Sequence, residues 1–274
     1  MISTYISKSI SKENLLKYAE KRLDQYNWGE VYKSREDGVI LVPGDYPNSI
    51  TNLVFCLSIS DKAIVRVDKT IDKFDAEIAL AIEYSSVKEV VLDKDEFSDL
   101  DNYFKFFKGL LVTSPKREIS NENFSSFSIV KNFVGKGIGA IAIGFNTGKL
   151  MKGQTLYTYP ELKQVMIKEI QLMDNSLNEV ESHNYVGLAL SNIKAEELGK
   201  ALISTKDVVE RKYDLIKSEY FKSSLTQLAF ISNGIKLETR QENLFSPIFE
   251  NIEVFSPSLD KNKNRIVGKA KLVF

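Results

Sequence analysis

Residues 133–204 read FVGKGIGAIAIGFNTGKLMKGQTLYTYPELKQVMIKEIQLMDNSLNEVESHNYVGLALSNIKAEELGKALIS. Short apolar runs alternate in this stretch with three turn signals, Gly-Lys-Gly, Asn-Thr-Gly and Lys-Gly. A long helix would instead show apolar residues recurring at helical spacing over many turns. The observed punctuation is typical of short antiparallel strands joined by tight turns. We therefore expect an all-β domain over residues 119–204, where the same texture begins.

A second all-β block follows in residues 205–274. Its apolar runs lie in DVVERKYDLIKSEYF, TQLAFISNGIKLETR and RIVGKAKLVF. The Asn233-Gly234 pair inside the second run is a strong signal for a β-hairpin, because both residues tolerate the positive φ angles of the tight turn. Only in this block do Lys and Arg outnumber Asp and Glu, by 12 to 9.

Residues 1–118 have a mixed α/β texture instead. We expect strands at 2–6, 38–44, 62–67, 88–92 and 110–114, and helices at 15–23 (with Ser11 as N-cap), 49–60, 75–86 and 99–110. Strands that alternate with helices of 10 to 12 residues imply βαβ crossovers and a parallel sheet. The predicted fold class is α/β plus all-β, with domains at 1–118, 119–204 and 205–274.

The composition excludes several classes of function. The chain has 37 Lys+Arg and 37 Asp+Glu, so no global field attracts it to nucleic acid or to an anionic membrane, and any such affinity must come from a local patch. Cys56 and His183 are the single cysteine and histidine, which excludes a disulfide framework and a Cys/His zinc site. The sequence has neither a run of about 18 apolar residues nor a signal-peptide h-region. We expect a cytoplasmic protein without a metal, a cofactor, or a membrane or DNA partner.

Two glycine clusters invite a nucleotide interpretation, at residues 135–139 and 144–149. A phosphate-binding loop needs Gly-x-x-x-x-Gly-Lys-Ser/Thr between a strand and a helix. The second cluster has only three residues between its glycines, and Leu150 occupies the position of the hydroxyl residue. Both clusters are therefore interpreted as hairpin turns.

Other polar and aromatic signals have a structural and a functional interpretation. His183 lacks companion ligands and is expected in a surface loop rather than as a general base. The acidic run 93–96 is expected to be a solvated loop rather than a cation site, and the aromatic string 103–107 to be helix core. One basic stretch is a candidate nucleic-acid patch, with solvated strand-edge lysines as the alternative; it comprises Lys261, Lys263, Arg265, Lys269 and Lys271.

Several motifs in residues 133–204 occur together at fixed spacing. They are a Gly-x-Gly opening, the Gly148-Lys149-Leu150 hairpin, Ile170-Gln171 with Asp174, and Val186-Gly187-Leu188-Ala189-Leu190. This pattern resembles the second domain, a β-barrel, of translational GTPases related to elongation factor Tu, and most of all the archaeal selenocysteine-specific elongation factors. By position, residues 205–274 are similar to the third domain of that family, a second antiparallel barrel.

Reading backward, residues 1–118 resemble a shortened G domain of the same family. Tyr46-Pro47-x-Ser49-Ile50 and Asp61-x-Ala63 are similar to the segment after the third GTPase motif. The residues that bind phosphate, Mg²⁺ and guanine in the GTPase motifs are missing, however. No phosphate loop follows Lys8, Pro43 or Leu41 stands at the position of the Mg²⁺-linked aspartate, and the guanine motif is reduced to Asp93-Lys94-Asp95-Glu96. The nucleotide-binding remnants are Gly44 and Lys94 at most.

The resemblance therefore implies an elongation-factor-like pseudo-GTPase without catalytic residues, because phosphoryl transfer depends on positioning by the missing groups. In the family, the second domain helps to hold the aminoacylated end of tRNA; the remnants of that pocket here are His183, Asn184 and Tyr185. We expect a non-enzymatic factor that associates with tRNA or the ribosome. The alternatives are a protein-binding regulator, and a GTPase with non-standard motifs.

Overall fold

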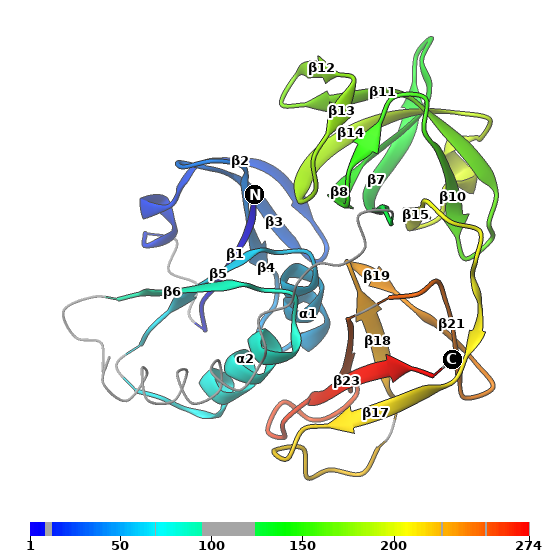
Figure 1. The fold of residues 1–274 in the computed structure, drawn as a ribbon. Coiled ribbons are helices and arrows are strands. Elements are labelled where there is room, and N and C mark those ends of the chain that lie inside the picture. Colours follow the sequence, from blue (N-terminus) through cyan, green and yellow to red (C-terminus); the bar gives the residue numbers. More distant parts are fainter. Residues whose placement is uncertain (9–12, 69, 95–123, 226, 250, 274) are drawn as a thin grey trace.

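The computed structural model describes residues 1–8, 13–68, 70–94, 124–225, 227–249 and 251–273. Figure 1 shows three groups of elements, which we call the first block (residues 1–94), the barrel (124–204) and the third block (205–273). The helix expected at 99–110, the strand at 110–114 and Ser11 lie outside the described residues, and so does the expected boundary at 118. The domain limits stay predictions.

The first block is a six-stranded sheet with the order β2-β3-β4-β1-β5-β6. Its strands are β1 (Ile2–Ile6), β2 (Ala19–Tyr26), β3 (Gly29–Ser34), β4 (Val39–Pro43), β5 (Lys62–Arg66) and β6 (Glu89–Asp93). Strands β4, β1, β5 and β6 pair in parallel, while β2 and β3 pair antiparallel at one edge. The sheet is therefore mixed, and not wholly parallel as expected.

Two helices provide the crossovers of the parallel part. Helix α1 (Ile50–Ser58) and helix α2 (Lys73–Tyr84) confirm the helices expected at 49–60 and 75–86. Asp72 caps α2, because its carboxylate accepts a hydrogen bond from the Phe74 N–H at 2.7 Å.

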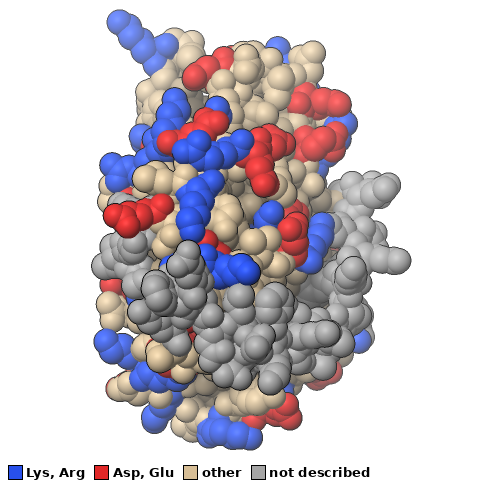
Figure 2. Space-filling model, turned by 90° about the vertical axis from the view of Figure 1, so that its left-hand side faces the viewer, with Lys and Arg blue, Asp and Glu red and all other residues tan. Residues whose placement is uncertain are grey.

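Figure 2 shows basic and acidic side chains interspersed over the described part of the face it presents, in keeping with a chain of zero net charge.

The helix expected at 15–23 is wrong. A single 3-10 turn, η1 (Leu15–Lys17), is followed at once by strand β2. Arg22 bonds Glu30 at 2.8 Å and Lys33 pairs with Glu20 at 2.7 Å, so the charged residues of β2 meet partners on β3. Cross-strand pairing at the sheet edge thus outweighs the helical spacing of the apolar residues.

The barrel consists of antiparallel strands, as the turn pattern predicts. Six strands close on themselves in the order β10-β15-β7-β8-β14-β11, with β10 paired to β11. These are β7 (Ser126–Gly135), β8 (Gly139–Thr147), β10 (Thr155–Tyr159), β11 (Gln164–Leu172), β14 (Asn184–Ser191) and β15 (Ala201–Ile203). Short additions are β9 (Leu150–Met151), β12 (Asn175–Leu177), β13 (Glu179–Val180) and the turn η2 (Ala195–Glu197).

The third block contains two sheets rather than one sheet closed by hydrogen bonds, within the residues that are described. One sheet has the order β16-β21-β20 and the other β17-β23-β22-β18-β19. The strands are β16 (Val209–Arg211), β17 (Tyr213–Lys217), β18 (Ala229–Ser232), β19 (Ile235–Lys236), β20 (Glu238–Arg240), β21 (Asn243–Ser246), β22 (Ile252–Phe255) and β23 (Ile266–Leu272). Both sheets bury side chains in one apolar core.

The predicted Asn233-Gly234 turn joins β18 to β19 and is the point where the three parts of the molecule meet. Both residues have positive φ, 51° and 71°. The Gly234 N–H donates to the Ser58 hydroxyl of the first block at 3.0 Å, and the Asn233 carbonyl accepts from the Ser128 hydroxyl of the barrel at 2.9 Å. A Cβ at Gly234 would lie only 2.5 Å from Ile59. The junction therefore requires glycine.

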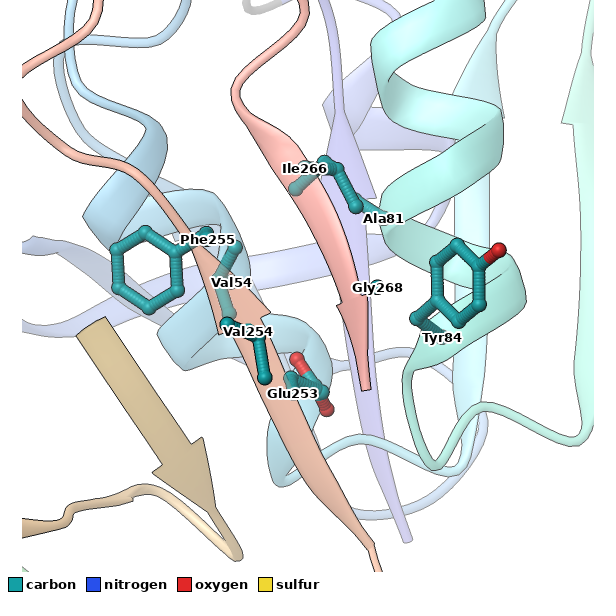
Figure 3. A pocket seen from close by; sticks show the side chains of 8 residues that line it. All are labelled: Val54, Ala81, Tyr84, Glu253, Val254, Phe255, Ile266 and Gly268. Carbon is teal, nitrogen blue, oxygen red and sulfur yellow. The ribbon is translucent and has the colours of Figure 1, made fainter. Parts of the chain in front are cut away.

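The third block packs on α1 and α2 through β22 and β23 (Figure 3). Val54 and Ala81 come from the two helices, and Phe255 and Ile266 from the strands. These side chains fit so closely that no room for a water molecule remains between them. The contact therefore resembles a continuous apolar core more than a polar surface between separate domains.

One buried ion pair lies at the edge of this contact. Arg265, with 1% of its surface exposed, bonds the Glu77 carboxylate twice, from Nε at 3.0 Å and from Nη2 at 2.6 Å. Its guanidinium also donates to the carbonyls of Pro47 and Asn48. Both charges are therefore fully hydrogen-bonded, which is the condition under which a buried pair is tolerated.

We predict that Arg265→Met lowers the free energy of unfolding by about 3–5 kcal/mol, because it leaves the Glu77 carboxylate buried without a partner. Urea denaturation followed by circular dichroism measures the change. The double variant Arg265→Met/Glu77→Leu should lose less, and Lys271→Met, at an exposed position of β23, should lose almost nothing. A loss under about 1 kcal/mol in Arg265→Met would contradict the assigned role.

Candidate functional site

The carboxyl ends of the parallel strands are the usual ligand-binding edge of an open α/β sheet. Lys8 lies there, just after β1, with its ammonium group 2.5 Å from Asp75, 3.5 Å from Asp72 and 3.7 Å from Asp68. Burial opposes the charge of Lys8, but the three carboxylates outweigh it and raise its pKa. The lysine charge is thus already neutralised, and three carboxylates would repel a phosphate.

Asp93, which begins the guanine-motif remnant, points into the first block. It is 2% exposed and accepts hydrogen bonds from the Tyr5 hydroxyl at 2.9 Å and the Tyr18 hydroxyl at 3.3 Å. Burial and the Asp93 charge raise the pKa of Tyr18 to about 12 and that of Tyr5 well above its usual value, so both phenols stay protonated donors. Arg66 lies 3.5 Å from the same carboxylate. The aspartate is therefore committed to internal contacts.

The two nucleotide remnants are not brought together. Gly44 follows β4 and exposed Lys94 follows β6, with β1 and β5 between these strands. The Gly44 N–H donates to the Trp28 carbonyl at 2.8 Å, and its own carbonyl accepts from Asn52 at 2.8 Å. Gly44 thus has a structural role in the turn beside β3. Asp95 and Glu96 lie outside the described residues.

His183 lies in the loop before β14, as expected, but it and Tyr185 of β14 contact the first block, so the expected exposure of this histidine at the surface is wrong. The His183 side chain is only 15% exposed, and its Nδ1 lies 3.2 Å from Asp61. The Tyr185 hydroxyl donates to Asp24 at 2.7 Å and lies 2.5 Å from the Tyr26 hydroxyl. Asn184 bonds within the loop and to Asn146. His183 and Tyr185 thus join the barrel to the first block, whereas the hydrogen bonds of Asn184 lie within the barrel.

An aromatic cluster underlies this contact and has no signature in the sequence. Trp28 stacks on Tyr26 at 5.4 Å between ring centroids and meets Phe55 of α1 at 5.0 Å. Phe145 of the barrel packs against Trp28 and against Tyr185, at 5.9 and 5.0 Å. The five rings come from four separate segments of the chain and follow no common period. Only the fold shows that they form one cluster.

The C-terminal basic residues divide into two classes. Arg265 is buried in its pair with Glu77, so its assignment to a surface patch is wrong. Lys261, Lys263 and Lys271 are exposed, and Lys269 is partly buried. Lys269 and Lys271 face Glu253 and Asp214 on the neighbouring strands. These acidic neighbours reduce the local positive potential. The RNA contacts of the four lysines stay predictions.

A small apolar pocket opens on the outside of the barrel. It has a volume of about 130 Å³ and is lined by Phe133, Ile138, Ile141, Ile143, Glu169, Gln171, Gly187, Leu188 and Ala189. Phe133 is 39% exposed and Ile138 45%, although both are large apolar residues. Exposed apolar surface around a concave site is typical of binding sites. The sequence signal for this pocket would have been Phe133 and Val134 directly before the Gly-x-Gly turn.

Polar groups surround this pocket. The Lys131 ammonium lies 5.8 Å from the centre of the Phe133 ring, and Lys168 donates to the Ile138 carbonyl at 3.4 Å. Among the lining residues, Glu169 accepts from the Ser176 hydroxyl at 2.6 Å and from the Gln171 amide at 3.3 Å. The site thus combines an exposed ring, two lysines and amide or carboxylate groups.

Metal-binding and membrane-spanning features are absent from the described part of the chain. Among those residues, no group of three His, Cys, Asp or Glu side chains is arranged to hold a metal ion. None of the described helices has the length and apolarity needed to span a membrane.

Comparison with known proteins supports the fold. No family model matches the chain. An uncharacterised protein of Methanocaldococcus jannaschii is 24% identical over 195 residues, 63% of this chain, and the match spans only 62% of that relative's length. Among solved structures, translation elongation factor SelB of Methanococcus maripaludis with the GTP analogue GppNHp has a TM-score of 0.67 and 15% identity over 100% of this chain and 78% of its own.

Two further structures agree. The apo form of the same SelB has a TM-score of 0.66 and 15% identity, covering 100% of this chain and 79% of its own. A bacterial selenocysteine-specific elongation factor has a TM-score of 0.60 and 11% identity, covering 99% of this chain and 57% of its own. The chain therefore has the fold of selenocysteine-specific elongation factors, which confirms the resemblance at the level of the fold.

We predict that His183 titrates below its ordinary pKa of about 6.5. Burial lowers its pKa, Asp61 raises it, and Lys88 lowers it again. Because the folded state resists protonation, stability is fully present above about pH 6.5 and is lost as the pH falls toward the folded pKa. The chain has one histidine, so a single imidazole resonance in an NMR titration reports the value.

Two variants check the assigned causes. Asp61→Asn should lower the His183 pKa further, and Lys88→Gln should raise it, because each removes one neighbouring charge. A midpoint at or above 6.5 in the parent protein would contradict the prediction that burial outweighs the attraction of Asp61.

Proposed function

We propose that the protein is a non-enzymatic, elongation-factor-like RNA-binding factor that associates with tRNA or the ribosome in the cytoplasm. The observation that carries this proposal is the barrel pocket with its exposed Phe133 ring. An exposed aromatic side chain offers a stacking surface for an unpaired base, and nearby lysines offer contacts to phosphates. Glu169 and Gln171 supply hydrogen-bonding groups at the edge of the pocket.

The lack of GTPase chemistry is the second part of the proposal. In support of it, the Lys8 charge is neutralised by three aspartates, and Asp93 is bonded to buried Tyr5 and half-buried Tyr18. A polyphosphate at this edge would lose its hydration and meet carboxylates in return. The similar structures include one with a GTP analogue, but the likeness extends to the fold alone.

A protein-binding regulator is the alternative function. It would use the same exposed apolar surface at Phe133, Val134 and Ile138 for a protein partner. Salt dependence distinguishes the two, because RNA binding releases counterions from phosphates and weakens steeply with salt.

We predict no measurable binding of GTP or GDP with Mg²⁺ in isothermal titration calorimetry at protein concentrations of about 100 μM, where a micromolar dissociation constant gives a clear signal. Pro43→Asp should not create binding, since a single carboxylate does not replace a phosphate loop. A micromolar dissociation constant in the parent protein would refute this part of the proposal and favour a GTPase with non-standard motifs.

We predict separable effects on tRNA binding for the pocket and the lysines. Phe133→Ala should weaken binding by about 1–3 kcal/mol without changing the salt slope, because it removes stacking. Replacing Lys261, Lys263, Lys269 and Lys271 by Gln should lower the slope by about 0.7–0.9 for each phosphate that these lysines neutralise. Fluorescence anisotropy at several salt concentrations measures both.

Two controls match these variants. Phe133→Tyr retains a ring and should bind tRNA as the parent does. Val209→Ala removes an exposed apolar residue of the third block, away from the pocket, and as a control it should also bind tRNA as the parent does. If the parent neither binds tRNA nor sediments with ribosomes, the RNA proposal fails and the protein-binding alternative moves ahead.

A further inference from the structure

A large cavity lies where the first block, the barrel and the third block meet. Its volume is about 770 Å³, and all three parts contribute to its walls. Its lining residues include members of α1, β7 and β19, which Figure 1 labels in the three parts. Ligand sites typically have volumes of about 300–1,000 Å³ and often lie between domains. The cavity shares no lining residue with the barrel pocket, although Lys131, which lines the cavity, also lies 5.8 Å from the centre of the Phe133 ring.

The walls of the cavity are largely apolar. Trp28 and Phe55 line it from the first block, Ile129 from the barrel, and Ile231 and Ile235 from the third block. Trp28 and Phe55 also belong to the aromatic cluster, so their rings are held in place by neighbours. A wall that is already ordered costs little entropy when a ligand binds.

The charged groups of the cavity are mainly positive. Lys131, Lys200 and Lys236 line it and are exposed, and the described residues contain no carboxylate within ion-pair distance of these three lysines. Of the two acidic lining residues, Glu238 already bonds the Arg240 guanidinium at 3.0 and 3.4 Å. Glu161 remains as the only opposing charge among these described residues. The cavity therefore favours an anion.

We propose that this cavity binds a small anionic molecule with an apolar ring or chain. The apolar part would lie against Trp28 and Phe55, and the anionic group would lie near Lys200 and Lys236. A ligand in this position contacts all three parts of the molecule at once. It therefore stabilises their arrangement by mass action, in proportion to its binding.

The test uses the complete chain and the fluorescent probe 8-anilinonaphthalene-1-sulfonate, which joins a sulfonate to aromatic rings. We expect saturable binding of about one probe per chain and a rise in the thermal unfolding midpoint with probe concentration. The variant Lys200→Gln/Lys236→Gln should raise the dissociation constant roughly 3- to 30-fold, since it removes two partly exposed positive charges from the site.

Matched controls separate charge from apolar binding. Lys212→Gln/Lys222→Gln removes two lysines that do not line the cavity and should bind the probe as the parent does. The uncharged analogue N-phenyl-1-naphthylamine should bind parent and Lys200→Gln/Lys236→Gln equally. Thr51→Trp, which adds a large side chain to the lining, should reduce binding of both probes.

The proposal is overturned if Lys200→Gln/Lys236→Gln binds the sulfonate as tightly as the parent, or if many probes bind each chain without saturation. It is also overturned if a short single-stranded RNA displaces the probe, because the occupant would then be RNA. Phe133→Ala should leave probe binding unchanged. The cavity and the RNA-binding function can therefore fail independently.

Discussion

Gly234 imposes the steric constraint on which the arrangement of the three parts depends. Its backbone lies between Ile59 of the first block and Ser128 of the barrel, each 2.5 Å from the position a Cβ would take. Its N–H also donates to the Ser58 hydroxyl. A side chain at this position would force the third block away from both neighbours. The apolar contact of β22 and β23 with the helices, and the cavity beside the turn, follow from this close approach.

Polar residues reinforce the arrangement by pairing across the contacts between the blocks. Arg265 of the third block pairs with Glu77 of α2, Tyr185 of the barrel bonds Asp24, and His183 lies beside Asp61. Each of these groups is at least partly withdrawn from water, so an unpaired partner would carry a desolvation cost. At these positions the charged and hydroxyl side chains hold the blocks together, and they are therefore not available to a nucleotide or an RNA.

Local sequence signals predicted the elements whose cause is local. Helices α1 and α2 have apolar residues at helical spacing, and the Asn233-Gly234 turn has the residues that its positive φ angles require. Strand β2 was missed because its partner β3 decides its conformation, through cross-strand ion pairs that have no signature in a single segment. The resemblance of residues 133–204 to the second domain of translational GTPases predicted a closed barrel, whereas no single strand of this segment predicts closure.

The candidate sites also depend on contacts between distant segments, which the local sequence does not predict. Arg265 and the lysines near it are equivalent in sequence, but Glu77, 188 residues away, makes Arg265 an internal residue. The position of His183 is likewise explained by its contact with Asp61. Phe133 is a candidate for ligand binding because its ring stays exposed on the folded barrel. A basic residue is available to a ligand only when the fold leaves its charge without an internal ion-pair partner, and an aromatic residue only when part of its ring stays uncovered. Whether a side chain is available to a ligand therefore depends on contacts between distant segments, and a linear motif does not predict these contacts.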